Sequence, residues 1–389
     1  MHHKWLLTDI DSDVYVDAMD IGPRDVPGID AKSRFAIRKH RLRGGLCDGV
    51  DVVELDSGAM RCTVVPTRGM GLWRAQVGDL RLGWQSPVRG PVHPKFVNLY
   101  EDGGLGWLDG FDELMCRCGL ESNGGPVYDE QGRLLYALHG RIANSPAHLV
   151  AAAFDPEQRE ISLMGQVDET RLFHNKLRLT STVIMPLGEP RLKIVDTVTN
   201  LSAEPGELQL LYHTNFGSPL LESGSKLLAP AKMVIPQTSR AAEGVAEWDV
   251  YGPPESGYSE MVNFLELLGD GNGNTEVLLK NARSDTGVSL LFNTRQLPTF
   301  TQWKSTQAIE DGYVTGLEPG VNLSNPRTFE KAQGRVIELA GGESRSFELE
   351  IAVHTTSGAV SAAEKRIASL RGNVEAKIYP SPQSGWSPT

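Results

Sequence analysis

Long apolar runs and an excess of positive charge are absent from this sequence, and cysteines are few. No apolar run approaches the roughly 20 residues of a membrane-spanning helix, and the first residues lack the apolar centre of a secretory signal. The formal net charge of −11 disfavours a nucleic-acid backbone or an anionic membrane as a partner. The sequence therefore predicts a cytoplasmic protein that binds neither membranes nor nucleic acids.

Only four cysteines occur among the 389 residues: Cys47, Cys62, Cys116 and Cys118. Cys116 and Cys118 are too close in sequence for an easy disulfide, and no second paired cluster completes a zinc site. We therefore expect free, mostly buried thiols, no bound metal and no cofactor.

Short strand patterns fill most of the chain, which is 40% hydrophobic. Val52–Leu55 and Met60–Val65, for example, flank a Ser57-Gly58 turn and predict a hairpin. Many such strands, with no alternation of strands and long helices, predict an all-β fold. The expected architecture is a large antiparallel β-sandwich with a few peripheral helices.

Three segments are expected along the chain. Residues 1–48 contain short charged segments, and this pattern predicts an N-terminal elaboration packed on the main domain. Residues 49–358 carry the strand pattern of the sandwich, and residues 359–389 form a C-terminal helix and tail. The helix is expected from Val360 to Leu370, with Ser361 as its N-cap.

The segment around His213 has the pattern of a ligand site. Leu192–Asn200 and Leu208–Tyr212 are apolar runs separated by a turn at residues 202–206, which predicts neighbouring antiparallel strands. His213 would then lie where a buried strand ends, followed by short polar residues. A titratable ring in such a place is typical of a polar binding site, although a structural histidine in the core is the alternative.

Residues 85–138 interrupt the strand pattern with a stretch rich in glycine and proline. A loop of this length in a compact domain is usually functional or disordered, and Trp107 argues against disorder. Trp73 and Trp84 lie within predicted hairpins, so we interpret them as core residues.

Four short motifs supply groups for acid–base chemistry. They are Val65–Met70 with Arg68, Leu138–Arg141 with His139, Tyr212–Gly217 with His213 and Asn215, and Gly316–Asn322 with Glu318. Each motif alone is a weak signal. Together they provide two imidazoles, one carboxylate and one cation, which are the groups needed for general acid–base chemistry on a hydroxylated substrate.

These motifs resemble those of the aldose 1-epimerase (galactose mutarotase-like) superfamily. Pro66–Met70, His139–Ile142 and Leu211–Gly217 are most similar to a less characterised branch that is described as a domain of unknown function. The similarity extends over roughly residues 45–355. It implies a galactose mutarotase-like supersandwich, an isomerase activity and a small carbohydrate as substrate, a monosaccharide or a sugar derivative.

The resemblance also implies a role for each matching residue. Glu318 corresponds to the general base that takes the proton of the anomeric hydroxyl, and His213 to the acid that protonates the ring oxygen. His139 corresponds to a histidine that holds a sugar oxygen, and Arg68 to an arginine that contacts the sugar. Further substrate-binding candidates are His93, Asn215, Trp107, Trp303 and Lys304, with Asp109 and Asp112 as candidates for the substrate-binding aspartate.

Two other functions are compatible with the same residues. One is a different sugar isomerisation or a lyase reaction that uses Lys304, or a metal held by His93, His139 and Glu318. The other is carbohydrate binding without turnover, in which Trp107, Trp303 and Tyr313 stack on the sugar while the histidines only form hydrogen bonds. The sequence leaves the identity of the sugar and the oligomeric state open, with a homodimer among the alternatives.

Overall fold

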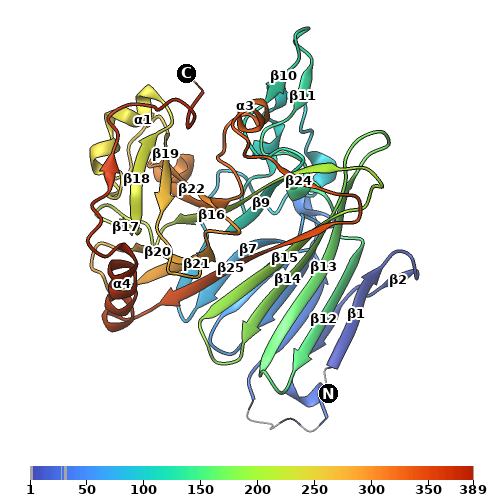
Figure 1. The fold of residues 1–389 in the computed structure, drawn as a ribbon. Coiled ribbons are helices and arrows are strands. Elements are labelled where there is room, and N and C mark those ends of the chain that lie inside the picture. Colours follow the sequence, from blue (N-terminus) through green and yellow to red (C-terminus); the bar gives the residue numbers. More distant parts are fainter. Residues whose placement is uncertain (1–2, 28, 30–32, 389) are drawn as a thin grey trace.

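Two large β-sheets packed face to face dominate the computed structural model, which describes residues 3–27, 29 and 33–388 (Figure 1). Within these residues, neighbouring strands pair antiparallel, apart from one short parallel pair at an edge of the larger sheet. A large hydrophobic core includes side chains from both sheets. The predicted all-β fold, an antiparallel sandwich with a few peripheral helices, is confirmed.

The smaller sheet contains ten of the described strands. Their order is β17 (Lys226–Leu228), β20 (Asn274–Lys280), β21 (Gly287–Asn293), β25 (Ser344–His354), β15 (Arg191–Asn200), β14 (Lys176–Pro186), β13 (Glu160–Thr170), β12 (Leu149–Asp155), β1 (His3–Asp9) and β2 (Val14–Tyr15). The long strands β13 to β15 alternate buried and half-buried residues, because one face of the sheet packs on the core and the other faces solvent.

The larger sheet contains fourteen of the described strands. Its main order is β26 (Lys377–Ile378), β18 (Ala231–Pro236), β19 (Met261–Leu267), β22 (Thr299–Ser305), β23 (Val314–Gly320), β16 (Gly206–Gly217), β9 (Met115–Leu120), β7 (Gly71–Val77), β6 (Arg61–Val65), β5 (Asp51–Asp56), β4 (Ala36–Arg41) and β3 (Met19–Ile21). Two more strands join it, β24 (Ile337–Leu339) beside β16 and β8 (Leu80–Leu82) beside β7.

The remaining elements are short and lie around the two sheets. A separate ribbon pairs β10 (Val127–Tyr128) with β11 (Leu134–Tyr136). The α-helices are α1 (Ser239–Glu243), α2 (Ile309–Gly312), α3 (Arg327–Ala332) and α4 (Ser357–Arg371). The 3-10 helices are η1 (Pro23–Asp25), η2 (Gly45–Cys47), η3 (Pro94–Phe96), η4 (Asp102–Gly104), η5 (Gly106–Gly110), η6 (Ile142–Asn144) and η7 (Val245–Glu247). No helix among the described residues is long and apolar enough to cross a membrane.

Two expectations about the central strands are wrong. The runs that predicted neighbouring strands are β15 and β16, and they belong to different sheets, so the turn between them crosses from one side of the sandwich to the other. His213 lies inside β16 rather than at its end. The interruption at residues 85–138 contains the strand β9, which is buried along its whole length and pairs with β16.

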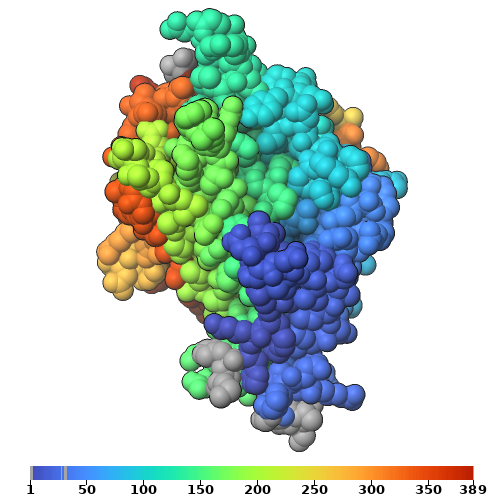
Figure 2. Space-filling view, turned by 90° about the vertical axis from the view of Figure 1, so that its right-hand side faces the viewer, coloured from blue at the N-terminus to red at the C-terminus, as the bar shows by residue number. Residues whose placement is uncertain are grey.

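Segments near both ends of the described chain join the sheets, β1 at one end and β26 at the other. The N-terminal segment expected as an elaboration supplies β1 and β2 to one sheet and β3 and β4 to the other, and Figure 2 shows it (blue) against the green strands of the smaller sheet. Helix α4 begins at Ser357 with Thr356 as N-cap, rather than with Ser361, and packs on Leu278 of β20. The described cysteines are free, and three of the four are buried, as expected.

A buried ion pair joins the two sheets at their centre. Arg117 on β9 pairs with Asp196 on β15, and neither side chain is accessible to solvent. The same guanidinium donates to Ser181 Oγ on β14 at 2.7 Å and to the backbone oxygen of Met70 at 2.9 Å. Tyr212 on β16 donates its hydroxyl to Asp196 at 2.9 Å. This cluster therefore fixes the positions of strands from both sheets.

We expect Asp196→Asn to destabilise the fold strongly, because it leaves the Arg117 charge buried without its partner. Removing one member of a buried pair costs about 3–5 kcal/mol. The control is Glu348→Gln, which breaks the half-exposed pair with Lys193 on β15 and should cost less than about 1 kcal/mol. Denaturant unfolding measures both changes, and equal costs would contradict the central role of the pair.

Candidate active site

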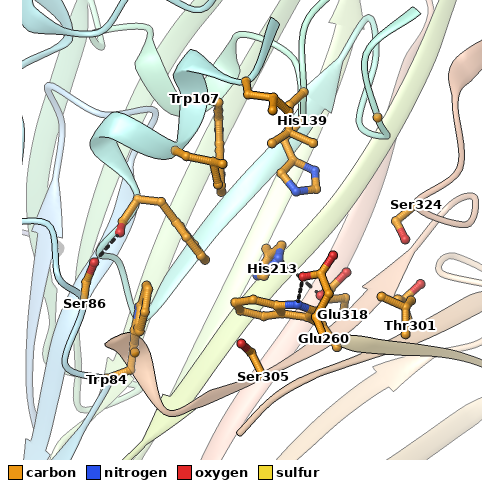
Figure 3. A pocket seen from close by; sticks show the side chains of 18 of the residues that line it. Trp84, Ser86, Trp107, His139, His213, Glu260, Thr301, Ser305, Glu318 and Ser324 are labelled. Atoms are coloured by element: carbon orange, nitrogen blue, oxygen red, sulfur yellow. Dashed lines mark hydrogen bonds and ion pairs between the residues drawn. The ribbon is translucent and has the colours of Figure 1, made fainter. Parts of the chain in front are cut away.

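A cavity of about 610 Å³ is lined by side chains of the larger sheet (Figure 3). It lies on the outer face of that sheet, because His213 alternates along β16 with Tyr212, whose side chain belongs to the core between the sheets. Its floor is formed by side chains of β16, β23 and β22, and its wall by residues from the segment 84–111 and by Leu138 and His139. His139, His213 and Glu318, the three predicted catalytic residues, all line it. The strands and the long loop thus bring together residues that are far apart in sequence.

The strand register places His213 and Glu318 side by side. Leu211 pairs with Gly320 and Thr214 with Leu317, so His213 of β16 falls opposite Glu318 of β23. Residues opposite each other on one face of an antiparallel pair are within contact distance. On the far side of Glu318, Thr301 of β22 is its register partner and also lines the cavity. The floor is therefore a row of side chains across adjacent strands.

Gly316 leaves the space in which this pair meets. It stands in the next row, opposite Asn215 on one side and Trp303 on the other. A Cβ atom at this position would lie 2.5 Å from Glu318 Oε1 and 3.0 Å from His213 Cε1. Any larger residue would therefore displace the carboxylate or the imidazole.

The ring of His213 is held by bonds on both nitrogens. Its Nε2 lies 3.3 Å from Glu318 Oε1, and its Nδ1 lies 2.7 Å from Asn215 Oδ1. The amide nitrogen of Asn215 donates to the backbone oxygen of Glu113 at 3.0 Å, which turns the amide oxygen towards the ring. Asn215 Oδ1 therefore accepts from Nδ1–H, and Nε2 faces the carboxyl group. Asn215, predicted to bind substrate, is placed to orient His213.

Burial disfavours the charged form of both partners. It lowers the pKa of His213 to about 3, helped by the neighbouring His139. Burial also raises the pKa of Glu318 well above its ordinary range, with a further contribution from the charge of Glu260. With the site empty, the pair therefore carries one proton, held between the carboxyl group and the imidazole.

His139 approaches the pair from the opposite wall (Figure 3). Its backbone has a φ of 56°, a left-handed conformation that is rare outside glycine. Its Nδ1 lies 2.8 Å from the backbone oxygen of Asn123, which leaves Nε2 free to bond to a ligand. Its ring centroid is 5.4 Å from that of His213 and 4.6 Å from that of Trp107. Burial lowers the pKa of His139 to about 4.

Aromatic and polar side chains that the sequence analysis missed complete the cavity. Trp84, interpreted from the sequence as a core residue, lines the cavity together with Phe111. Glu260 accepts a hydrogen bond from Trp303 Nε1 at 2.6 Å. The buried atoms Trp107 Nε1 and Thr301 Oγ1 have no hydrogen-bond partner within the described residues. Groups of this kind in a cavity wall are available to a ligand.

The structure does not support the predicted sugar contact of Arg68. Its side chain is fully buried and pairs with Glu113. The guanidinium also donates to the backbone oxygens of Val92 at 3.0 Å and Gly110 at 2.9 Å, and to Asn144 Oδ1 at 2.8 Å. Arg68 is therefore occupied in holding the loop that forms the cavity wall.

Lys304 and His93 also lie outside the cavity lining. Lys304 follows Trp303 on β22, so the alternation of a strand points it to the other face, where it donates to three backbone oxygens at 2.7–3.2 Å. His93 caps η3 by accepting from the backbone nitrogen of Lys95. Neither the lysine-centred reaction nor the metal site built on His93 is therefore supported.

Of the other aromatic and acidic candidates, some line the cavity and some lie elsewhere. Trp107 and Trp303 line the cavity as predicted for ligand contacts. Asp109 is exposed on η5, and Asp112 is buried and accepts from Trp73 Nε1 at 2.8 Å. Tyr313 is a core residue whose hydroxyl donates to the backbone oxygen of Gly252.

Residues 47–353 match the family described as a domain of unknown function, DUF4432. The chain belongs to this family. It is 35% identical to a candidate aldose 1-epimerase from Klebsiella pneumoniae subsp. pneumoniae, whose crystal structure superposes with a TM-score of 0.95 over 99% of this chain and 100% of that one. Comparison with curated proteins finds no match.

More distant structures share the fold alone. Galactose 1-epimerase from Lactobacillus acidophilus is 11% identical, with a TM-score of 0.54 over 83% of this chain and all of that one. A candidate aldose 1-epimerase from Escherichia coli K12 is 15% identical, with a TM-score of 0.53 over 79% of this chain and all of that one. This DUF4432 member therefore has the galactose mutarotase-like sandwich fold.

We expect the rings of His139 and His213 to remain neutral well below the ordinary histidine pKa of 6.5. Nitrogen NMR shifts of the imidazoles, followed against pH, should give midpoints at about 4 and about 3. His139→Asn and His213→Asn assign the two signals by their disappearance. A midpoint near 6.5 for either ring would show that this imidazole is exposed to water rather than desolvated.

Proposed function

We propose that this protein is an aldose 1-epimerase-like isomerase that binds a monosaccharide or sugar derivative and interconverts its anomers. The observation that carries the proposal is the 3.3 Å contact between His213 Nε2 and Glu318 Oε1 at the floor of an aromatic-lined cavity. Anomer exchange needs one group that accepts a proton and one that donates it on the same sugar face. An adjacent imidazole and carboxyl group supply both.

The single proton of the pair can occupy either partner. The empty site favours a neutral carboxyl group and a neutral ring, because burial disfavours the charged forms. A bound sugar changes this balance, since its anomeric hydroxyl donates to the Glu318 carboxylate and its ring oxygen accepts from His213 Nε2–H. Substrate thus stabilises the form in which Glu318 is the base and His213 the acid.

From that form the reaction proceeds without any further reactant. Glu318 takes the proton of the anomeric hydroxyl while His213 gives its proton to the ring oxygen. The bond between C1 and the ring oxygen breaks, and C1 becomes an aldehyde carbon. Rotation about C1–C2 presents the other face, and the reverse proton transfers close the ring. The proton count of enzyme and sugar is unchanged.

The other cavity groups have positioning roles in this proposal. His139 Nε2, free because Nδ1 is tied to Asn123, accepts from a sugar hydroxyl. Trp107 and Trp303 offer ring faces and edges to the apolar CH groups of a pyranose. Asn215 keeps His213 in the tautomer that faces Glu318.

We expect Glu318→Gln to reduce the rate of anomer exchange by about a hundred- to ten-thousand-fold, because it removes the proton acceptor while keeping the shape. His213→Asn should have a similar effect through loss of the acid. NMR exchange spectroscopy or polarimetry on a panel of α-anomers measures the rate, and calorimetry should show little change in sugar affinity. Asp109→Asn, an exposed change outside the cavity lining, is the control. A wild-type rate in Glu318→Gln would refute the proposed role of this residue.

The pH dependence provides an independent check. The one-proton state of the pair persists until His213 gains a second proton at about pH 3 or Glu318 loses its proton above the ordinary carboxyl range. We therefore expect kcat/KM to show no acid fall until the pH approaches about 4, where the rings of His139 and His213 begin to gain a proton, and to fall on the alkaline side at a pH above the ordinary carboxyl range. Glu260→Gln removes a negative charge that raises the pKa of Glu318, so the alkaline fall should move to lower pH. Loss of activity as the pH falls through 6.5 would instead indicate an exposed imidazole.

A further inference from the structure

The cavity is larger than one sugar ring requires. A hexose has twelve non-hydrogen atoms, and even at the ~30 Å³ that a water molecule occupies in the liquid, they would fill at most about 360 Å³. The cavity measures about 610 Å³. At least about 250 Å³ therefore remains for a further part of the substrate once one ring lies on the His213–Glu318 pair.

The additional space lies on a defined side of the pair. In Figure 3, His139 and Trp107 stand above His213 and Glu318, whereas Trp84, Ser86 and Ser305 stand below and to the left. We refer to the region lined by Trp84, Ser86, Ser305, Gln307 and Asp311 as the Trp84 lobe; Gln307 belongs to it through its hydrogen bond to Ser305, and Asp311 because it precedes Gly312, which packs on Trp84. A ring held by His139 would leave this lobe free.

The aromatic wall of the Trp84 lobe is fixed before any ligand binds. Trp84 Nε1 donates to the backbone oxygen of Glu113 at 3.2 Å, and Ser86 Oγ donates to the backbone oxygen of Phe111 at 2.8 Å. The indole packs on Gly312, where a Cβ atom would lie 3.0 Å from Trp84 Cζ3. The ring centroid of Trp84 is 5.0 Å from that of Phe111. A rigid, half-buried indole is the kind of surface on which a sugar ring packs.

The polar groups of the cavity indicate the charge of its ligand. Gln307 donates to Ser305 Oγ at 3.1 Å, and Asp311 presents an exposed carboxylate at the edge of the lobe. Glu260 adds a second exposed carboxylate. No arginine or lysine is found among the described residues that line the cavity. An anionic substituent would meet carboxylates without a compensating cation, which disfavours it.

We propose that the Trp84 lobe is a second sugar-binding subsite, and that the substrate is a reducing saccharide of at least two units without an anionic group. This inference rests on the proposed function, because it takes the ring that opens to be the one on His213 and Glu318. The second unit packs on Trp84 and bonds to Ser305, Gln307 and Asp311. The cavity excludes sugar phosphates and uronates on grounds of charge.

The test compares sugars by size and charge. The kcat/KM for anomer exchange is measured with the α-anomers of glucose and galactose, and of the reducing disaccharides maltose, lactose and melibiose. We expect at least one disaccharide to exceed its reducing-end hexose by tenfold or more. Glucose 6-phosphate and glucuronate should fall at least tenfold below glucose. A disaccharide advantage in none of the three, or a preference for glucose 6-phosphate, would overturn the inference.

Variants in the lobe assign the effect to its residues. Trp84→Ala should reduce the ratio of disaccharide to hexose kcat/KM about tenfold, and a general loss of folding or activity would leave this ratio unchanged. Gln307→Trp, which fills the lobe instead of opening it, should reduce the same ratio. Asp311→Asn is compared with Glu310→Gln, its exposed neighbour on α2 that does not line the cavity. Asp311→Asn should alter the ratio of disaccharide to hexose kcat/KM, and Glu310→Gln should not.

The inference and the proposed function can fail separately. Exchange of hexoses with no disaccharide advantage would overturn the second subsite and leave the isomerase standing. Exchange of neither class would overturn the isomerase, and calorimetry with the same sugars would then decide the subsite. The second subsite is then supported only if a disaccharide binds at least tenfold more tightly than its reducing-end hexose and Trp84→Ala abolishes this difference.

Discussion

The ion pair between Arg117 and Asp196 is the interaction on which the arrangement of this sandwich depends. It joins β9 of one sheet to β15 of the other in a place that water does not reach, so each charge depends on the other for its stability. Arg117 is flanked by Cys116 and Cys118, which point to the outer face beneath the cavity, and Asp196 also binds the hydroxyl of Tyr212, the neighbour of His213. The strands that carry the site are thereby fixed from their core-facing side.

On the outer face, the chemistry follows from strand register. Opposed positions on β16 and β23 bring an imidazole and a carboxyl group to 3.3 Å, and Gly316 keeps the space around them open. Neither group is exposed, so both charged forms are costly and the pair holds a single proton. Loops often supply catalytic residues, but the acid–base pair proposed for this protein lies on two adjacent strands, and a loop supplies the surrounding wall.

The sequence predicted the all-β fold because alternation and turn residues are local signals, and it pointed to His139, His213 and Glu318 through motif resemblance. It failed where the answer depended on the face of a strand or on a distant partner. Lys304 is next to Trp303, so the alternation of a strand already placed the two side chains on opposite faces, and this signal was available in the sequence.

Other errors had no local signal. Arg68 pairs with Glu113, 45 positions away, and no local pattern indicates that pairing. The turn at residues 202–206 could equally have joined strands within one sheet, because a short connection does not reveal that it crosses the sandwich.

Arg68, buried rather than facing the ligand, has a consequence for binding kinetics. It ties the segment around Val92, the end of η5 at Gly110 and Asn144 to one guanidinium, so the wall opposite the strands is held in place independently of any ligand. The conformational entropy of that wall is lost when the chain folds and not when a ligand binds. For any ligand of this cavity, association then requires no movement of this wall, and the lifetime of the complex depends on the contacts that the ligand itself makes.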